Sequence, residues 1–444
     1  MGDEHVRRLR DTIPVFADGG TALTAEGPVF PDHRVDRRSP EVKTLHNSLF
    51  MILPVILKSW LQARCLCEIV TSDESPASLA SRSGWVAEVI LGGKINNVQG
   101  LRAYAAIAVV VYHTGYVFPH MLQLGKFGVD LFFVISGYIM ARICETNTQF
   151  FLRRRLIRIV PPYWLCTILL YMFALYWPKL LLSTHPSRAD LFKSLLFVPY
   201  YKMGLIRPVL YVGWSLNYEI LFYLLVAVSI FLLPRHPLLL TAAFVSAVHF
   251  VCQPLAARGA IPDCYSDIRM FEFLLGIAVY EIARRVPETI AIRLRFFSLG
   301  ALLTSLVCVI LLQGRFPGVF QMEWVYMQLL SAFVVLSASL LSQGGWDLRI
   351  AWIVLIGDAS YILYLVHVYV LNLADRVLRQ RFHWLQIDEF AGCIAVTALC
   401  VVTAVLMHLK LEKPTVAYLN EHFGGHRRTR EFSRVRVPSR KVAP

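Results

Sequence analysis

Charged residues are scarce in this chain. Only 17% of its 444 residues are Asp, Glu, Lys or Arg, whereas 56% are hydrophobic. Soluble domains carry about a quarter charged residues. The apolar residues stand in long blocks rather than at the spacing of amphipathic helices, which favours repeated membrane spans over one very large core.

Several other features are missing. The nine cysteines contain no CxxC pair and most lie in apolar runs, so we predict neither a metal site nor a disulfide framework. No internal repeat is visible, which argues against a secondary transporter. The net charge of +14 would suit nucleic acid. The basic residues instead lie in tails and loops between apolar blocks, which is typical of contact with an anionic cytoplasmic leaflet, and we predict no nucleic-acid partner.

The chain divides into three parts. Residues 1–93 are charged and contain Pro and Ser, and their one apolar patch, "SLFMILPVILKSWL", is too short to span and lacks a signal-peptide cleavage site. We interpret them as a poorly ordered extension whose patch suits an interfacial amphipathic helix. Residues 94–414 are predicted to form the membrane domain, and residues 415–444 a short basic cytoplasmic tail.

The predicted fold class is an all-α integral membrane bundle of about ten transmembrane helices around a polar interior cavity. Each block is near the ~20 residues that cross a bilayer. The longest connection, residues 178–213, contains "LFKSLLFVPYY", for which we expect a short interfacial or re-entrant helix. The blocks are residues 101–118, 127–144, 159–177, 214–233, 238–253, 270–284, 297–313, 324–342, 353–373 and 390–411.

The basic cluster "RRRLIR" directly abuts a predicted span, and positive charge close to a span marks the cytoplasmic side. An even number of spans then places both termini in the cytoplasm. The basic character of the outward connection 178–213 is evidence against this orientation.

An arginine and a histidine interrupt the first block, "GLRAYAAIAVVVYHTG". Arg102 and His113 are eleven positions apart, so on a helix they point within about 20° of each other and lie about 16 Å apart along the axis. An ionisable side chain inside a bilayer is costly unless it faces protein or water. His113 is either a neutral residue hydrogen-bonded between helices or a general base in an interior cavity.

The next two blocks carry an isolated acid and a group of arginines. Asp130, in "FGVDLFFVISGYIMAR", either caps its helix or orients His113 or an arginine across the short hairpin. In "FLRRRLIRIVPPYW", Arg155 and Arg158 share one helix face, and paired guanidinium groups bind phosphates well. With Arg153 they serve either as an anchor at the membrane surface or as a phosphate site. We expect Pro161-Pro162 to fix the entry angle of the following helix.

Two later blocks add further polar groups. Glu219 lies one turn after Ser215 in "WSLNYEILFYLL". Ser360, Tyr364 and His367 lie within about 60° of one another on one helix face. Each alone is explained by hydrogen bonds between helices. Convergence of all these groups in one bundle predicts a polar cavity.

Taken in order, these motifs resemble the acyltransferase-three family of bacterial integral membrane acyltransferases. The motifs are "LRAYAAIAVVVYH", "FGVDLFFVISGYIM", "FLRRRLIRIVPPYW", "WSLNYEILFY", "RMFEFLLGIAVY", "SYILYLVH" and "LEKP", from about residue 95 to residue 414. The resemblance implies ten spans, an acyl-CoA donor used from the cytoplasm, and a sugar hydroxyl as acceptor. It also implies that Arg102 and His113 are needed for activity and that Arg155 and Arg158 match an RxxR motif. No hydrolase-like domain is expected after the membrane domain.

The expected function is therefore O-acyl transfer, most simply of acetyl from acetyl-CoA, to an exopolysaccharide, lipopolysaccharide or related glycan at the bacterial inner membrane. Acetyl-CoA is a co-substrate, and no permanently bound cofactor is expected. His113 would act as general base, Asp130 or Glu219 would set its tautomer, and Arg155, Arg158 and Arg153 would bind the donor's phosphates. Tyr364, His367 and Ser360 would contact the substrate or oxyanion. An acyl-histidine intermediate remains an alternative.

Three rival functions remain at this point. The acceptor is alternatively a lipid, peptidoglycan or a small molecule. The second rival is a polytopic transporter. The third is an acyl-sugar flippase or scaffold without chemistry, against which the intact spacing of Arg102 and His113 argues. The sequence leaves the oligomeric state open.

Overall fold

The computed structural model describes residues 95–115, 125, 127–176, 187–315, 323–381 and 389–423. The N-terminal extension and its predicted interfacial helix lie outside these residues. All ten apolar blocks form helices. They are α5 (Asn96–Thr114), α6 (Gly128–Thr146), α7 (Phe151–Tyr176), α9 (Trp214–Leu232), α10 (Pro237–Cys252), α12 (Met270–Ala283), α13 (Glu288–Arg315), α14 (Glu323–Gln343), α15 (Ala351–Arg381) and α16 (Glu389–Met407).

Seven of these helices, among the described residues, are long and apolar enough to cross a membrane: α7, α9, α10, α13, α14, α15 and α16. The other three helices do not meet these criteria of length and apolar character, each for a reason found in its sequence. Helix α5 begins with polar residues, α6 carries Asp130, Arg142 and Glu145, and α12 has only 14 residues. A multi-pass membrane protein is therefore confirmed, and the count of about ten spans stays a prediction.

Short elements occupy the connections. The expected helix in the 178–213 connection is α8 (Arg188–Leu195), which begins with a capping box: Ser187 Oγ accepts from the Asp190 amide at 3.1 Å, and Asp190 Oδ2 accepts from the Ser187 amide at 3.0 Å. After it come β1 (Tyr201–Lys202), β2 (Leu205–Ile206) and the 3₁₀ turn η2 (Tyr211–Gly213). Further on lie η3 (Gln253–Arg258), α11 (Ala260–Tyr265), the π-helical turn η4 (His408–Glu412) and α17 (Lys413–Phe423).

Helix α7 corrects one expectation. It begins at Phe151, includes the arginine cluster, and continues through Pro161 and Pro162, so the prolines lie inside the helix rather than at its entry. A proline removes the amide donor that its helix would use for the carbonyl four residues earlier. In this region Tyr361 of α15 donates to the Ile159 carbonyl at 2.7 Å. The interruption thus coincides with a tie between α7 and α15.

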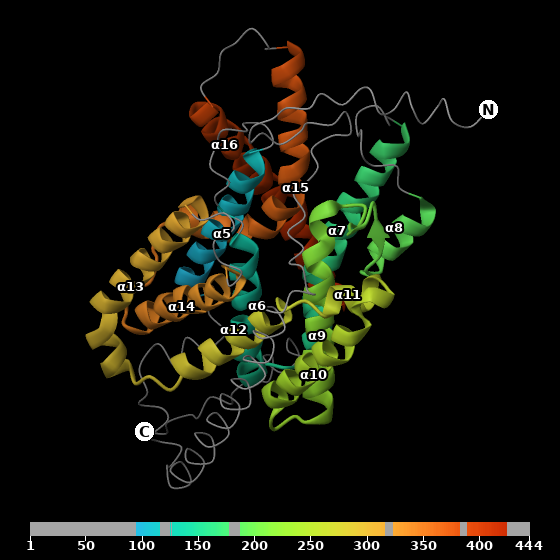
Figure 1. Cartoon of the computed structure of the whole chain (residues 1–444). Helices are drawn as coiled ribbons and strands as arrows, with labels where there is room; N and C mark the ends of the chain where they lie inside the picture. The colour runs from blue at the N-terminus through green and yellow to red at the C-terminus, as the bar shows by residue number, and fades with distance from the viewer. Residues whose placement is uncertain are drawn as a thin grey trace, which may run out of the picture.

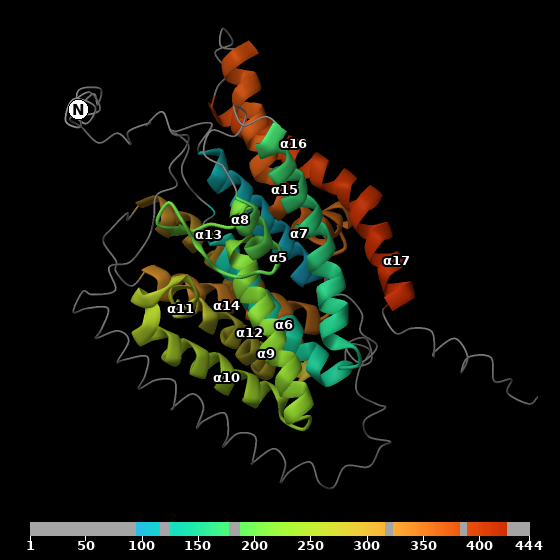
Figure 2. The same ribbon diagram turned by 90° about the vertical axis from the view of Figure 1, so that its right-hand side faces the viewer.

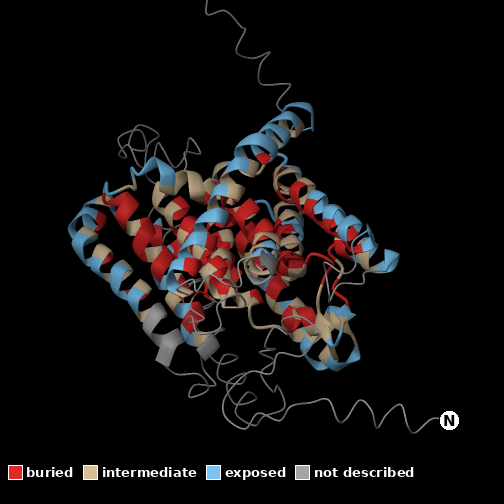
Figure 3. Ribbon diagram, turned by 90° about the horizontal axis from the view of Figure 1, so that it is seen from above, coloured by how far each residue is buried: buried red, intermediate tan, exposed pale blue. Residues whose placement is uncertain are grey.

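Helix α5 lies at the centre of the bundle, packed against α6, α14, α15 and α16. Figures 1 and 2 show it running beside α15. In Figure 1, α13 and α14 lie on one side of it and α9 and α10 on the other. In Figure 3 buried residues gather in the middle of the bundle and exposed ones on its outer helices. The outward positions of α7 are large and apolar: Leu165, Ile168, Leu169, Phe173 and Leu175 are all exposed. Such a surface is suited to lipid.

Helices α6 and α12 form a close parallel pair. A Cβ atom placed on Gly276 would lie 2.1 Å from the Val134 carbonyl oxygen and 2.9 Å from the Gly137 Cα, so only glycine allows this approach. At one end Arg269 pairs with Asp130 at 3.9 Å.

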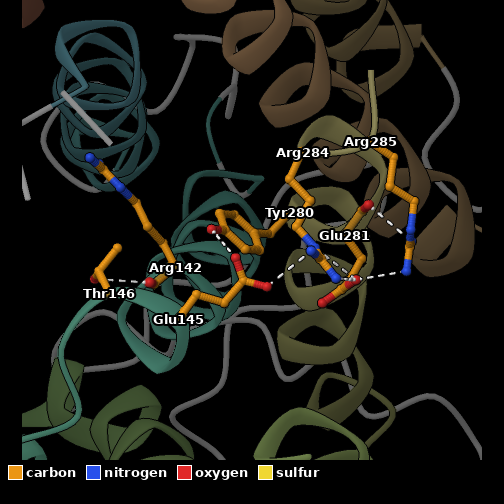
Figure 4. A network of polar contacts seen from close by, with 7 residues as sticks. All are labelled: Arg142, Glu145, Thr146, Tyr280, Glu281, Arg284 and Arg285. Atoms are coloured by element: carbon orange, nitrogen blue, oxygen red, sulfur yellow. Dashed lines mark hydrogen bonds and ion pairs between the residues drawn. The ribbon is translucent and has the colours of Figure 1, made fainter. Parts of the chain in front are cut away.

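The other end of this pair is held by the network in Figure 4. The Arg284 side chain contacts Glu145 at 3.3 Å and Glu281 at 2.8 Å. Tyr280 donates to Glu145 at 2.8 Å, and Arg285 pairs with Glu281 at 2.9 Å. Ion pairs at both ends and glycine contact between them make α6 and α12 one unit, and α6 forms a wall of the site described next.

Candidate active site

A cavity of about 80 Å³ lies between α5, α6, α7, α9 and α15. A single water needs ~10–15 Å³ of such space, so the cavity has room for several waters or a short acyl group. Hydrophobic side chains supply much of its wall, including Phe132, Ile139 and Leu216. Its polar lining residues are Arg102, Ser136, Arg155, Arg158, Ser215, Glu219, Tyr223, Ser360, Tyr361 and Tyr364.

Three guanidinium groups reach this cavity, from Arg102 of α5 and from Arg155 and Arg158 of α7. Arg102 is buried, and its Nη1 donates to Gln99 at 3.4 Å. The Nε of Arg155 is buried without a hydrogen-bond partner. The cavity therefore offers positive charge and free donors, the features that hold a phosphate or another anion.

Arg153 takes a different direction and is not among the lining residues. Its Nη1 donates to the Phe423 carbonyl at the end of α17 at 2.6 Å, and its guanidinium lies 5.2 Å from the centre of the Phe150 ring. Arg153 is two residues from Arg155 and five from Arg158, which turn the helix through about 200° and about 140° beyond a full turn, so Arg153 cannot share their face. The structure thus separates it from the two arginines with which it was grouped.

Glu219 is the only carboxylate among the residues that line this cavity. Its Oε1 accepts hydrogen bonds from Ser136 of α6, at 2.9 Å, and from Tyr223, one turn later on α9. Glu219 therefore joins α6 to α9 and places its carboxyl group in the cavity that the three arginines line.

Tyr364 and Ser215 close the part of the cavity formed by α15 and α9. The Tyr364 hydroxyl donates to the Val212 carbonyl at 2.8 Å and lies 2.8 Å from Ser215 Oγ. Ser360, one turn earlier on α15, is fully buried, and its hydroxyl has no hydrogen-bond partner. Buried hydroxyls of this kind are usually satisfied, so Ser360 is a group that a bound molecule would complete.

The rings of the two predicted histidines lie next to each other, on the far side of Tyr364 from the cavity. The rings of His113 and His367 have centroids 4.9 Å apart, and the Tyr364 ring is 6.0 Å from that of His367. Neither histidine is among the residues that line the cavity. Their helices approach closely because Gly357 of α15 lies against the backbone of Gln99, where a Cβ atom would be 2.2 Å from the carbonyl oxygen. Arg102 and His113 thus both face α15, at different positions along the axis of α5.

Asp130 lies in another cluster. It is buried and pairs with Arg269, the residue just before α12, and it does not line the cavity. The His113 Nδ1 instead lies 2.8 Å from the Val109 carbonyl of its own helix. That oxygen can only accept, so the contact places a proton on Nδ1. The backbone therefore sets the tautomer of His113, a role expected of Asp130 or Glu219. The arginine that Asp130 contacts directly precedes α12 and does not come from the first helix.

Sequence reasoning missed the cluster around Asp130. Arg269 also contacts Asp267 at 3.3 Å and lies 5.3 Å from the Trp214 ring centre, while Gln328 of α14 donates to the buried Glu272 at 3.1 Å. One signal was available: Asp130 and Gly137 share a helix face, and a glycine in such a position marks close approach of another helix. Tyr223, four residues after Glu219, was also recoverable from helical spacing.

Comparisons with known proteins place the chain in a family. The model of the acyltransferase domain family, Acyl_transf_3, matches residues 95–408, which include every residue that lines the cavity and both histidines. This chain belongs to that family. The resemblance seen in the sequence is thereby confirmed.

Several relatives share most of this region. Exopolysaccharide production protein ExoZ of Rhizobium meliloti (strain 1021) is 30% identical over 280 residues, which cover 60% of this chain and 83% of that protein. Acyltransferase MdmB of Streptomyces mycarofaciens is 26% identical over 385 residues, covering 73% and 92%. O-acetyltransferase OatA of Staphylococcus aureus is 24% identical over 314 residues, covering 61% and 49%. No solved structure matches the chain.

Proposed function

We propose that this membrane acyltransferase moves an acyl group, most simply acetyl, from acyl-CoA to a carbohydrate hydroxyl on an exported glycan. The observation that carries the proposal is a single cavity lined by Arg102, Arg155, Arg158 and Tyr364, with the paired histidines next to Tyr364 outside the lining. A phosphate-bearing thioester and a weakly acidic hydroxyl need these two kinds of group.

The donor's phosphates would bind at the arginines. Arg155 and Arg158 present planar donors from one helix face, and the unpartnered Nε of Arg155 gains a partner when an anion arrives. The cavity is too small for a whole CoA, whose nucleotide must lie outside it. We infer that the acyl end enters beside Ser136 and Tyr364 while the phosphates remain at the arginines.

His113 would serve as the general base. With the proton on Nδ1, its Nε2 carries a lone pair that accepts the hydroxyl proton as the acceptor oxygen attacks the thioester carbon. The Ser360 hydroxyl, which has no hydrogen-bond partner, would donate to the developing oxyanion, whereas the Tyr364 proton is already donated to the Val212 carbonyl. The proton then passes to the sulfur as the carbon–sulfur bond breaks, which gives an O-acyl glycan and free CoA.

The exported glycan is favoured by the relatives. One is named for exopolysaccharide production and another is named an O-acetyltransferase. We propose a bacterial inner-membrane location with both termini in the cytoplasm, which places Arg155 and Arg158 on the side of the CoA pool. A lipid, peptidoglycan or small-molecule acceptor is the second candidate, and a transporter the third.

Labelled acetyl-CoA supplied to membranes that contain the protein tests the proposal. The parent is expected to transfer label to extractable glycan, and His113→Ala is expected to lose at least ~100-fold in rate, since a general base contributes 10²–10⁴. Equal transfer by parent and His113→Ala would overturn the role of the histidine. Label in lipid or in small molecules would select the second candidate, and uptake without transfer the third.

A further inference from the structure

His367 is a buried histidine to which the proposed transfer reaction assigns no proton. It is fully buried in α15, and its Nδ1 lies 3.1 Å from the Leu363 carbonyl, one turn earlier on the same helix. As for His113, this contact places a proton on Nδ1 and leaves the lone pair on Nε2. The Nε2 of His367 is buried and has no hydrogen-bond partner.

A purely structural role explains this arrangement poorly. Burying a ring nitrogen without a partner costs free energy that a phenylalanine of similar shape would avoid. A histidine that joined helices would use both nitrogens, one on each helix, whereas the Nδ1 of His367 lies against a carbonyl of its own helix and its Nε2 has no partner. The second nitrogen of His367 is therefore left as an acceptor rather than used to join helices.

The two imidazoles are close enough to act together. Their ring centroids lie 4.9 Å apart, with an angle of 64° between the ring planes, so no third side chain fits between them. In a buried site two adjacent imidazoles cannot both carry positive charge, because the charges repel strongly at low dielectric. One extra proton on the pair is the state that this geometry accommodates.

We propose that His367 shares with His113 the proton that leaves the acceptor hydroxyl. This rests on the acyl-transfer function proposed above. The proton moves from the acceptor oxygen to His113 as the new carbon–oxygen bond forms, its charge is stabilised by the basic nitrogen of His367, and it leaves with the thiol as the carbon–sulfur bond breaks. His367 is a positioning residue in this scheme, since it acts through His113, and Tyr364 separates it from the cavity.

His367→Phe and His367→Gln test the idea, with His249→Phe as the matched control. His249 is also a buried histidine, but it lies in α10 against Phe271, away from α5 and α15. Each variant is assayed as the full chain in membranes for kcat and for the KM of acetyl-CoA. We expect His367→Phe to lower kcat at least ~30-fold with KM within about twofold of the parent, because proton handling and not donor binding is affected.

His367→Gln, which keeps a polar atom near the position of Nε2, is expected to retain several times the kcat of His367→Phe. Equal kcat in the parent and His367→Phe, or an equal loss in His249→Phe, would overturn the proposal. If His367→Phe fails to accumulate, His367→Gln alone decides, and parental kcat in that variant refutes proton sharing. Activity that survives His113→Ala would instead refute the proposed base, so the two failures are distinguishable.

Discussion

Replacing Gly276 with alanine is the sharpest test of how the cavity wall is positioned. The new Cβ would lie 2.1 Å from the Val134 carbonyl oxygen and 2.7 Å from the Tyr138 amide nitrogen, whereas ordinary contacts begin at 3.4 Å. Backbone atoms cannot rotate away, so α6 and α12 must separate by about 1 Å. Overpacking of this kind costs about 1–3 kcal/mol of stability.

The same shift reaches the active site through one residue. Ser136 adjoins Gly137 on α6 and donates to Glu219 at 2.9 Å, and a displacement near 1 Å exceeds what this hydrogen bond tolerates. Gly276→Ala is therefore expected to lower both the melting temperature in detergent and the rate of acyl transfer.

Gly300→Ala is the matched control for this substitution. Gly300 also lies inside a helix, α13, but a Cβ atom there would meet nothing within 4 Å. Alanine should stabilise that helix by roughly 0.5–1 kcal/mol. Differential scanning fluorimetry and the labelled-acetyl assay on both variants provide the comparison. Unchanged stability and activity in Gly276→Ala would refute the close packing of α6 on α12.

Two further predictions concern the arginines. Arg155→Ala is expected to raise the KM of acetyl-CoA about tenfold or more, since a charge-assisted hydrogen bond contributes ~1.5–3 kcal/mol. Arg153→Ala loses only its contacts at Phe423 and Phe150, so its KM for acetyl-CoA should stay within twofold of the parent's. Steady-state kinetics on membranes would contradict the donor site if both variants behaved alike. Arg269→Ala removes a cation that contacts both Asp130 and Asp267 and is expected to destabilise the protein by about 3–5 kcal/mol, seen as a lower melting temperature, while Arg269→Lys loses less. An unchanged melting temperature in Arg269→Ala would show that the pair is not needed.

The helices were largely predictable because the signal for them is local. Long apolar blocks form helices wherever backbone groups have no water to bind, and all ten blocks did so. The error at α7 has an identifiable source: arginines and a proline pair suggested a helix start at residue 159, yet α7 begins at Phe151 and passes through both prolines. The number of membrane spans depends on how deeply each helix lies in the bilayer, and the formation of a helix alone does not decide that.

Within the site, the sequence determined which side chains share a helix face. The spacing of Arg102 and His113 directs both toward α15, and that of Arg155 and Arg158 brings both to one cavity. The sequence also determined family membership, because the order of its motifs can be recognised without a structure. These properties follow from helical periodicity and from residue type.

Only the tertiary structure decided which faces meet. Asp130 pairs with Arg269 because Gly137 and Gly276 bring α6 against α12, and Glu219 meets Ser136 because α6 crosses α9. His113 and His367, 254 positions apart by their numbers, come together through the close contact of α5 with α15. Helical spacing specifies the direction in which a side chain points from the axis of its helix. Which residue it contacts in that direction depends on how whole helices pack, which is a property of the assembled bundle.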